Sequence, residues 1–317
     1  MLPIIFGRTH MTYIFSPRRL WAALAKFNPT HIHVEEDPHS LVGLEVAAIA
    51  GLAARGAKLS FFIWDNLARK PRFPISLIKR AFTAFSLARA SMVICGNREA
   101  EALLISVKNY RGCTRVLPQL GLDTSLYAGK PASSIELGPW VGYVGRLVPE
   151  KGLETLFEAL VHLKQLQWKL RIVGEGPMRE QIQTRWSQEF GDRLSFTGAV
   201  EHDAVPTELS GLDVFVLPSC STEFWVEQFG LTLAQAMMTG IACIGSCSGA
   251  IPEVLGDAGL IVAERNPEAL ANALKKMLDS PTLRQDLGGR AKRRALEHFS
   301  QEAVALKHLE AFREIAH

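Results

Sequence analysis

The sequence contains 317 residues with an ordinary globular composition and a formal net charge of +3, and a chain of this length is expected to form two domains. Its five cysteines show neither a CxxC pair nor the Cys/His spacing of a zinc site, and their odd number argues against a disulfide framework. No apolar run approaches about 18 residues and no signal-peptide pattern follows Met1, so we expect a cytoplasmic protein in a reducing compartment.

Short runs of β-branched and aromatic residues alternate with longer segments of helical period in the first part of the chain. Such alternation predicts a parallel sheet with helices on its faces. The first strand expected from the pattern begins only at residue 31. The expected strands are 31–35, 59–64 and 91–95, and the expected helices are 40–55, 75–89 and 97–107.

The alternation restarts after a segment rich in Pro, Gly and Ser, which is typical of a linker between domains. We therefore expect an α/β fold with two Rossmann-like parallel-sheet domains facing a cleft. The second set of expected strands is 140–145, 169–173, 194–197, 213–217, 241–245 and 259–262, with helices at 152–166, 177–190, 230–239 and 267–278 and a helical tail from 281. The expected divisions are an N-terminal domain over 1–130, a linker over 131–139, a C-terminal domain over 140–300, and a helix over 301–317 that packs back toward the N-terminal domain.

Charge is unevenly divided along the chain. Residues 1–139 hold 17 Lys/Arg and 9 Asp/Glu, net +8, which leaves 18 and 23, net −5, for residues 140–317. The basic excess is densest over 68–90, where the cations are interleaved with phenylalanines. Such a segment can lie on an anionic membrane surface or attract a phosphorylated substrate. The alternative is a solvated helix face packed by its phenylalanines.

Two loops that follow expected strands have features of anion sites. "GYVGRLVPEKG" (142–152) places Arg146 and Lys151 beside the start of a helix, where side-chain charge and helix dipole both favour an anion. A loop with two solvated charges is the alternative. "RIVGEGPM" (171–178) repeats the strand-glycine-helix layout but lacks the third glycine of a dinucleotide fingerprint, so a tight turn is an equal interpretation.

"EQFGLTLAQAMMTG" (227–240) places two hydroxyl-binding side chains around a helix start. If the helix begins near Gly230, its first amides can face a phosphate, Glu227 precedes them, and Gln235 lies about 7.5 Å further along the axis. A sugar, a diphosphate and a ribose also lie in a row, so the segment predicts a site that binds a nucleotide-sugar lengthwise. Simple packing of a capped helix accounts for the apolar residues but not for Glu227.

Several motifs then carry a family resemblance. "YVGRLVPEKG", "VGEGP", "FTGAV", "VFVLPS", "EQFGLTLAQAMMTG" and "SGAIPEVLGDAGLIV" follow the order and spacing of the C-terminal domain of retaining, family-4-type glycosyltransferases with the GT-B fold. The resemblance covers residues 140–317. Residues 1–139 resemble the family more loosely, through "IHVEEDPHSL", "VICGNREAEALL" and "VLPQLGLD".

The resemblance implies transfer of a sugar from a nucleotide-sugar donor to an acceptor hydroxyl of a glycan, glycolipid or similar glycoconjugate, with retention at the anomeric carbon. It implies catalytic roles for Arg146 and Lys151 at the leaving diphosphate and for Glu227 at the donor sugar. It implies no metal and no other cofactor, and no nucleic-acid partner is expected. The implied donor-binding residues are Gly145, Gly174, Glu175, Val200, Ser219, Phe229, Gly230, Leu231 and Gln235.

Three departures from the family pattern stand out. Gln235 replaces a glutamate that usually grips the ribose, and an amide offers one acceptor oxygen where a carboxylate offers two. Glu35 or Glu36 occupies the place of a functional histidine, so no catalytic histidine is expected. The chain starts late relative to the family, so we expect an N-terminal domain that lacks its first elements.

Two other functions remain open. A catalytically degenerate donor-binding or scaffold protein would fit the late start and Gln235. A Rossmann oxidoreductase is disfavoured because the third glycine is absent. The donor base, donor sugar, acceptor and linkage are not fixed by the sequence.

Overall fold

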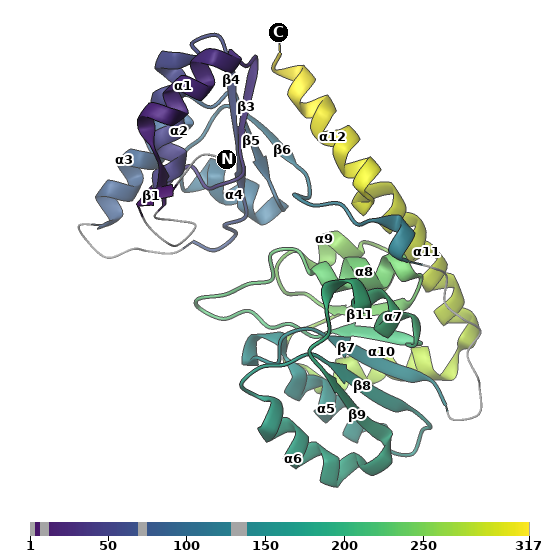
Figure 1. Cartoon of the computed structure of the whole chain (residues 1–317). Coiled ribbons are helices and arrows are strands. Elements are labelled where there is room, and N and C mark those ends of the chain that lie inside the picture. The colour runs from purple at the N-terminus through teal and green to yellow at the C-terminus, as the bar shows by residue number, and fades with distance from the viewer. Residues whose placement is uncertain (1–3, 7–12, 69–74, 128–137, 317) are drawn as a thin grey trace. The chain divides into compact units, whose positions relative to one another are not determined.

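The computed structural model describes residues 4–6, 13–68, 75–127 and 138–316 (Figure 1). The chain divides into two compact units. The first contains Met1–Gln119 and Val304–His317, and the second contains Leu120–Ala303. Most of the expected linker, residues 131–137, lies outside the described residues.

The first unit is built around a four-stranded parallel sheet with the order β3-β4-β5-β6. A short antiparallel pair, β1 and β2, precedes it. The elements are β1 (Ile4–Phe6), β2 (Ile14–Phe15), α1 (Pro17–Phe27), β3 (His31–Val34), α2 (Leu41–Ala53), β4 (Lys58–Ile63), α3 (Ile75–Leu87), β5 (Met92–Cys95), α4 (Arg98–Ser106), β6 (Cys113–Val116) and, at the end of the chain, α12 (Gln301–Glu314) from Val304 onward.

Both faces of this sheet are covered. Successive side chains of a strand point to opposite faces, so neighbouring residues of β4 join different cores. Phe61 packs with Val46 and other residues of the α2 side, whereas Phe62 packs with Ala311 and Phe312 of α12. Burial on both faces explains why β4 and β5 are almost continuously apolar.

The second unit is a six-stranded, wholly parallel sheet with the order β12-β11-β10-β7-β8-β9. The strand order reverses between β7 and β10, and ligands bind such sheets at this point, outside the carboxyl ends of the strands. The elements are β7 (Trp140–Val144), α5 (Leu153–Val161), β8 (Lys169–Val173), α6 (Arg179–Phe190), β9 (Leu194–Gly198), α7 (Val205–Ser210), β10 (Val214–Leu217), α8 (Leu231–Thr239), β11 (Ala242–Ser246), α9 (Ile251–Leu255), β12 (Leu260–Val262), α10 (Pro267–Asp279) and α11 (Pro281–Phe299).

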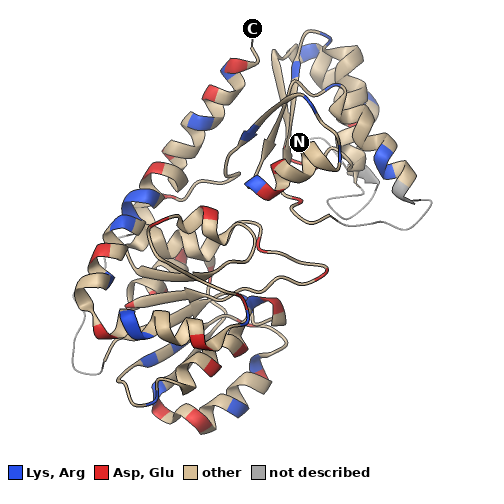
Figure 2. Ribbon diagram, turned by 180° about the vertical axis from the view of Figure 1, so that it is seen from behind, with Lys and Arg blue, Asp and Glu red and all other residues tan. Residues whose placement is uncertain are grey.

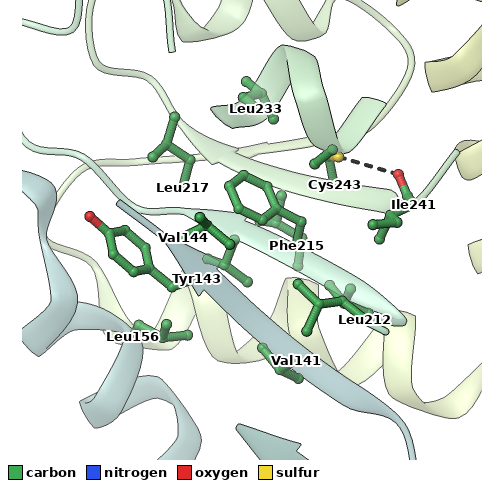
Figure 3. Packing of buried hydrophobic residues seen from close by; sticks show 14 of the residues in the cluster. Val141, Tyr143, Val144, Leu156, Leu212, Phe215, Leu217, Leu233, Ile241 and Cys243 are labelled. Atoms are coloured by element: carbon green, nitrogen blue, oxygen red, sulfur yellow. Dashed lines mark hydrogen bonds between the residues drawn. The ribbon is translucent and has the colours of Figure 1, made fainter. Parts of the chain in front are cut away.

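One large core holds the two central strands and α8 together (Figure 3). Val144 of β7 packs near Phe215 of β10 on the side of Leu233 in α8, whereas Tyr143 points to the opposite face of the sheet, toward Leu156 of α5. The Tyr143 hydroxyl donates to the carbonyl oxygen of Arg146 at 2.7 Å, so the core also fixes the loop that leaves β7.

The predicted α/β fold with two parallel sheets is confirmed, and the expected strands match β3–β5 and β7–β12 to within one or two residues. The expectation that the first strand begins at residue 31 was wrong, because β1, β2 and α1 precede it. The pattern also missed β6, α7 and α9, which have four to six residues each. The helical tail is not continuous: α11 ends at Phe299 and α12 begins at Gln301.

Candidate functional site

The residues singled out from the sequence gather at the carboxyl edge of the second sheet, around the reversal of strand order. Most of them lie in loops that directly follow strands, and the rest begin or belong to α8. Gly145, Arg146 and Lys151 follow β7, Gly174 and Glu175 follow β8, Val200 follows β9, Ser219, Glu227, Phe229 and Gly230 follow β10, and Leu231 and Gln235 lie in α8.

Glu227 is the centre of this arrangement. Its Oε2 atom lies 2.6 Å from Lys151 Nζ, and the Ser219 hydroxyl donates to the same oxygen at 2.9 Å. The side chains of Lys151 and Glu227 are only 14% and 8% exposed. The Lys151 ammonium also lies 4.6 Å from the centre of the Trp225 ring. A nearly buried ion pair of this kind needs such additional contacts to offset the loss of hydration.

Two glycines allow the neighbouring loops to approach the segment that carries Glu227. Gly152 has φ of 68°, and a Cβ atom there would lie 1.9 Å from the Pro218 carbonyl oxygen. Gly249 has φ of 50°, and a Cβ atom there would lie 2.1 Å from the Glu227 carbonyl oxygen. Any larger residue would push these loops apart, so glycine is required for steric as well as conformational reasons.

The start of α8 is arranged differently from a side-chain-capped helix. Gly230 is its N-cap, with φ of 81° and no side-chain hydrogen bond to the helix. The Gly230 carbonyl accepts from the amides of Leu233 and Ala234. The first amides of a helix lack partners within it, so the amides beside Gly230 are suited to hold an anion.

Gln235 points into the interior, with 1% of its surface exposed. Among the described residues, its Nε2 atom has no hydrogen-bond partner. Burial raises the pKa of the nearby Tyr127 phenol, and the Gln235 side chain opposes part of this rise. A buried amide with an unused donor is uncommon, because leaving it unsatisfied costs free energy.

The other predicted residues are less enclosed. Arg146 is exposed, and Glu175 is exposed and pairs with Arg179 Nη1 at 2.8 Å. Val200 and Phe229 are half-buried, and the Phe229 ring packs edge-on against Phe299 at 5.4 Å. These residues share the sheet edge with Glu227.

Four further residues lie at the same edge and were not predicted from the sequence: Ser221, Ser248, Glu264 and Arg265. They follow β10, β11 and β12, so the rule that directs attention to strand ends would have found them. Ser221 donates to Glu264 through both its amide and its hydroxyl, at 2.7 Å each. The loops after the last three strands are therefore connected by polar contacts.

In the first unit, the two glutamates that follow β3 have partners. Glu35 accepts from Gln119 Nε2 at 2.6 Å and lies 3.1 Å from His33 Nε2. The hydrogen bond with His33 is the largest effect on the Glu35 carboxyl and lowers its pKa. The hydrogen bond from Gln119 also lowers this pKa, whereas burial opposes both. Burial raises the pKa of the Tyr13 phenol, and the nearby Glu36 carboxylate raises it further.

Within the described ranges, no three His, Cys, Asp or Glu side chains are grouped so that they could hold a metal ion. None of the helices described above is long and apolar enough to cross a membrane.

Residues 132–294 match the family model described as group 1 glycosyl transferases. The chain belongs to this family. Among similar proteins, a GDP-mannose-dependent alpha-(1-6)-phosphatidylinositol monomannoside mannosyltransferase of Mycobacterium tuberculosis is 33% identical over 175 residues, which are 50% of this chain and 45% of the relative. A 2-deoxystreptamine N-acetyl-D-glucosaminyltransferase of Streptomyces fradiae is 30% identical and is matched over 92% of this chain and 71% of the relative.

A solved structure shares the fold of this group 1 glycosyl transferase. It is that of the Anabaena protein HepE in complex with UDP, with a TM-score of 0.77 and 20% identity over 94% of this chain and 82% of that chain. The GT-B fold is thereby confirmed. Because the similarity extends over 94% of the chain, the expected loss of early N-terminal elements is not supported. The matched part is about half the length of the mycobacterial relative.

Proposed function

We propose that this group 1 glycosyl transferase moves a sugar from a nucleotide-sugar donor to a hydroxyl group of a glycoconjugate, with retention at the anomeric carbon. The observation that carries the proposal is the Lys151–Glu227–Ser219 cluster at the reversal of strand order, directly before the N-terminus of α8. A cation, a carboxylate and free helix amides are brought together there. These are the groups needed to hold a diphosphate next to a hydroxyl-rich sugar.

The diphosphate leaving group would lie at the α8 N-terminus, against the amides of Gly230 and Leu231. Arg146 and Lys151 would neutralise the charge that develops as the bond to the sugar breaks. In this arrangement Lys151 exchanges Glu227 for a phosphate oxygen. The freed Glu227 carboxylate then accepts hydrogen bonds from the donor sugar. Fixed cations and amides take the role of a divalent ion, so we expect activity to survive chelation of metals.

Gln235 would lie at the ribose. Its unused Nε2 donor can bond to a ribose hydroxyl oxygen, while its single acceptor oxygen receives one hydroxyl hydrogen. The proposed donor site also includes Gly145, Gly174, Glu175 and Val200, which lie at the ends of β7, β8 and β9.

Thermal-shift measurements against UDP-, GDP-, ADP- and dTDP-sugars, with NADH as a control, test the donor site, because a ligand that binds only the folded state raises its stability. We expect a shift with one nucleotide series, and its loss in Arg146→Ala. The matched control is Arg185→Ala, which removes another exposed arginine of the same unit. No shift with any donor, or an equal shift with NADH, would contradict the proposal.

Turnover separates an active enzyme from a degenerate donor-binding protein. We expect release of the nucleoside diphosphate to depend on an added acceptor and to be lost in Glu227→Gln. Binding of a donor without any release would instead favour the donor-binding or scaffold alternative.

The acceptor is proposed to be lipid-linked, and the first unit offers a face suited to an anionic bilayer. α1 contains three cations and no acidic residue, and its Trp21 and Phe27 side chains are 44% and 81% exposed. α2 packs against both α1 and α3, and Leu77 and Ile78 of α3 are exposed. Figure 2 shows the distribution of charge over these helices. Exposed aromatic residues among cations are typical of membrane-surface helices.

Four of the basic and aromatic residues from the 68–90 segment, Arg69, Lys70, Arg72 and Phe73, lie outside the described residues. The solvated-face alternative has support as well, since the Arg89 guanidinium lies 3.8 Å from the centre of the Phe85 ring. Sedimentation with vesicles distinguishes the two. We expect binding to vesicles that contain phosphatidylglycerol, loss of binding at high salt, and weaker binding in Phe27→Ser but not in Leu306→Ser, which changes an exposed residue of α12.

A further inference from the structure

The loop between β10 and α8 carries Ser219, Trp225 and Glu227, and it is fixed at Ser221 by the turn between β12 and α10. The Ser221 amide donates to Glu264 Oε2 and its hydroxyl donates to Glu264 Oε1, both at 2.7 Å. On the other side, Arg265 Nη2 donates to the Ser221 carbonyl oxygen at 2.6 Å. We call these contacts of Glu264 and Arg265 the Ser221 clamp.

The backbone of the clamp is strained. Arg265 has φ of 52°, in the left-handed region that side chains other than those of Gly, Asn and Asp rarely adopt. Such conformations persist where the surroundings impose them, and they are concentrated at functional sites. Here the conformation coincides with hydrogen bonds between a single serine and two consecutive residues, of which Glu264 accepts and Arg265 donates.

The same loop has three further attachments, to the last residue of β11 and to the segment that follows it. The Ser246 hydroxyl donates to the Ser219 carbonyl oxygen, and the Ala250 amide donates to the Glu227 carbonyl oxygen at 3.0 Å. The hydroxyl of fully buried Ser248 lies 3.1 Å from that of Ser221. Hydrogen bonds therefore fix the loop before and after Trp225. The Ser221 clamp joins the loop to the turn that follows β12.

We propose that Glu264 and Arg265 are positioning residues for the transfer step, which hold the Ser219 hydroxyl and the Glu227 carboxylate in register with the donor sugar. This inference rests on the proposed function. Among the described residues, no hydrogen bond or ion pair joins Glu264 or Arg265 to Lys151 or to the start of α8, where the diphosphate is proposed to bind. Loosening the clamp should therefore reduce turnover much more than it reduces nucleotide affinity, because small displacements of reacting groups slow chemistry steeply.

Arg265→Gly is the sharpest test. Glycine adopts the positive φ without strain, so the variant removes the bond to Ser221 while leaving the melting temperature unchanged or higher. We expect kcat to fall about 10-fold to 100-fold, with the Kd for the nucleoside diphosphate changed less than about twofold. Asn109→Gly is the matched control, because it makes the same backbone change at φ of 52° in the other unit and should leave kcat unaltered.

Glu264 supplies a graded second test. Glu264→Gln keeps an acceptor for one of the two Ser221 donors and should retain more activity than Glu264→Ala. An Arg265→Gly enzyme with wild-type kcat, or with kcat and nucleotide affinity reduced equally, would overturn the inference. A wild-type protein that binds a nucleotide but shows no turnover would instead overturn the proposed function, so the two failures are distinguishable.

Discussion

The Glu227 carboxylate accepts hydrogen bonds from the Lys151 ammonium and the Ser219 hydroxyl, and its side chain is almost fully buried. Removing one member of such a pair leaves a buried charge without compensation. We therefore expect Lys151→Ala to lower the free energy of unfolding by about 3 kcal/mol. Arg146→Ala removes an exposed cation of the same proposed diphosphate site and should stay within about 0.5 kcal/mol of the wild type.

Urea denaturation of the two variants at neutral pH measures this difference. The prediction fails if the two substitutions cost the same free energy of unfolding. Both variants should lose transfer activity, because both cations are proposed to stabilise the leaving group. The two variants would then share the loss of activity but differ in their free energy of unfolding.

Gln235 gives a second prediction at the scale of one residue. A carboxylate at this position can accept from both ribose hydroxyls with charge assistance, so we expect Gln235→Glu to tighten donor binding about tenfold. The substitution also removes the Nε2 donor that has no partner among the described residues. Calorimetric titration with the donor measures the gain, and Gln183→Glu, on an exposed part of α6, is the control. Unchanged or weaker binding would argue against a ribose contact.

At the scale of elements, α12 covers one face of the first sheet through a cluster of aromatic and histidine side chains. The Phe312 ring lies 4.4 Å from the ring of His31 and 5.1 Å from that of His33. Both histidines share the Ser60 hydroxyl, at 2.8 and 2.6 Å. Burial, and then the charge of His33, lower the pKa of His31 below its usual 6.5. Beneath α12 the neutral form of His31 is therefore favoured.

This lowered pKa makes the first unit sensitive to acid. Because folded His31 binds its proton less readily than unfolded histidine, the unfolded state takes up more protons as pH falls through about 6.5. The stability contributed by neutral His31 is complete above that pH and is lost as pH falls toward the folded-state pKa. We expect the loss between pH 7.5 and 5.5 to be smaller in His31→Gln and unchanged in His202→Gln, measured by urea denaturation.

Most strands could be predicted from their β-branched and apolar residues, and β8, KLRIV, was placed without error. β6 has only four residues, CTRV, two of which are polar or charged, and α9 has only five, so neither pattern repeats often enough to stand out. Lys151 and Glu227 were singled out because each lies in a loop between a strand and a helix, whereas Ser219 came from the family resemblance; their roles at the donor stay predictions. The bonds from Ser221 to Glu264 join residues 43 positions apart, and nothing in the local pattern indicates such a contact.

At the scale of the whole molecule, the two units have separate hydrophobic cores. The proposed donor site uses residues of the second unit only. We expect calorimetry to resolve two unfolding transitions. The matching nucleoside diphosphate at about 100 times its Kd should stabilise one of them by about 2.7 kcal/mol and leave the other in place. If the nucleoside diphosphate shifted both unfolding transitions equally, the two units would unfold as one.

The return of α12 to the first unit also determines when that unit can be completed. A ribosome must add all of residues 120–303 before residues 304–316 follow, and at about 5–20 residues per second this takes roughly ten to forty seconds. Throughout this interval Phe62, Met92 and Ile94 form an uncovered apolar face. The unit that is synthesised first is therefore finished last, and during translation its uncovered apolar face is exposed to chaperones and to aggregation.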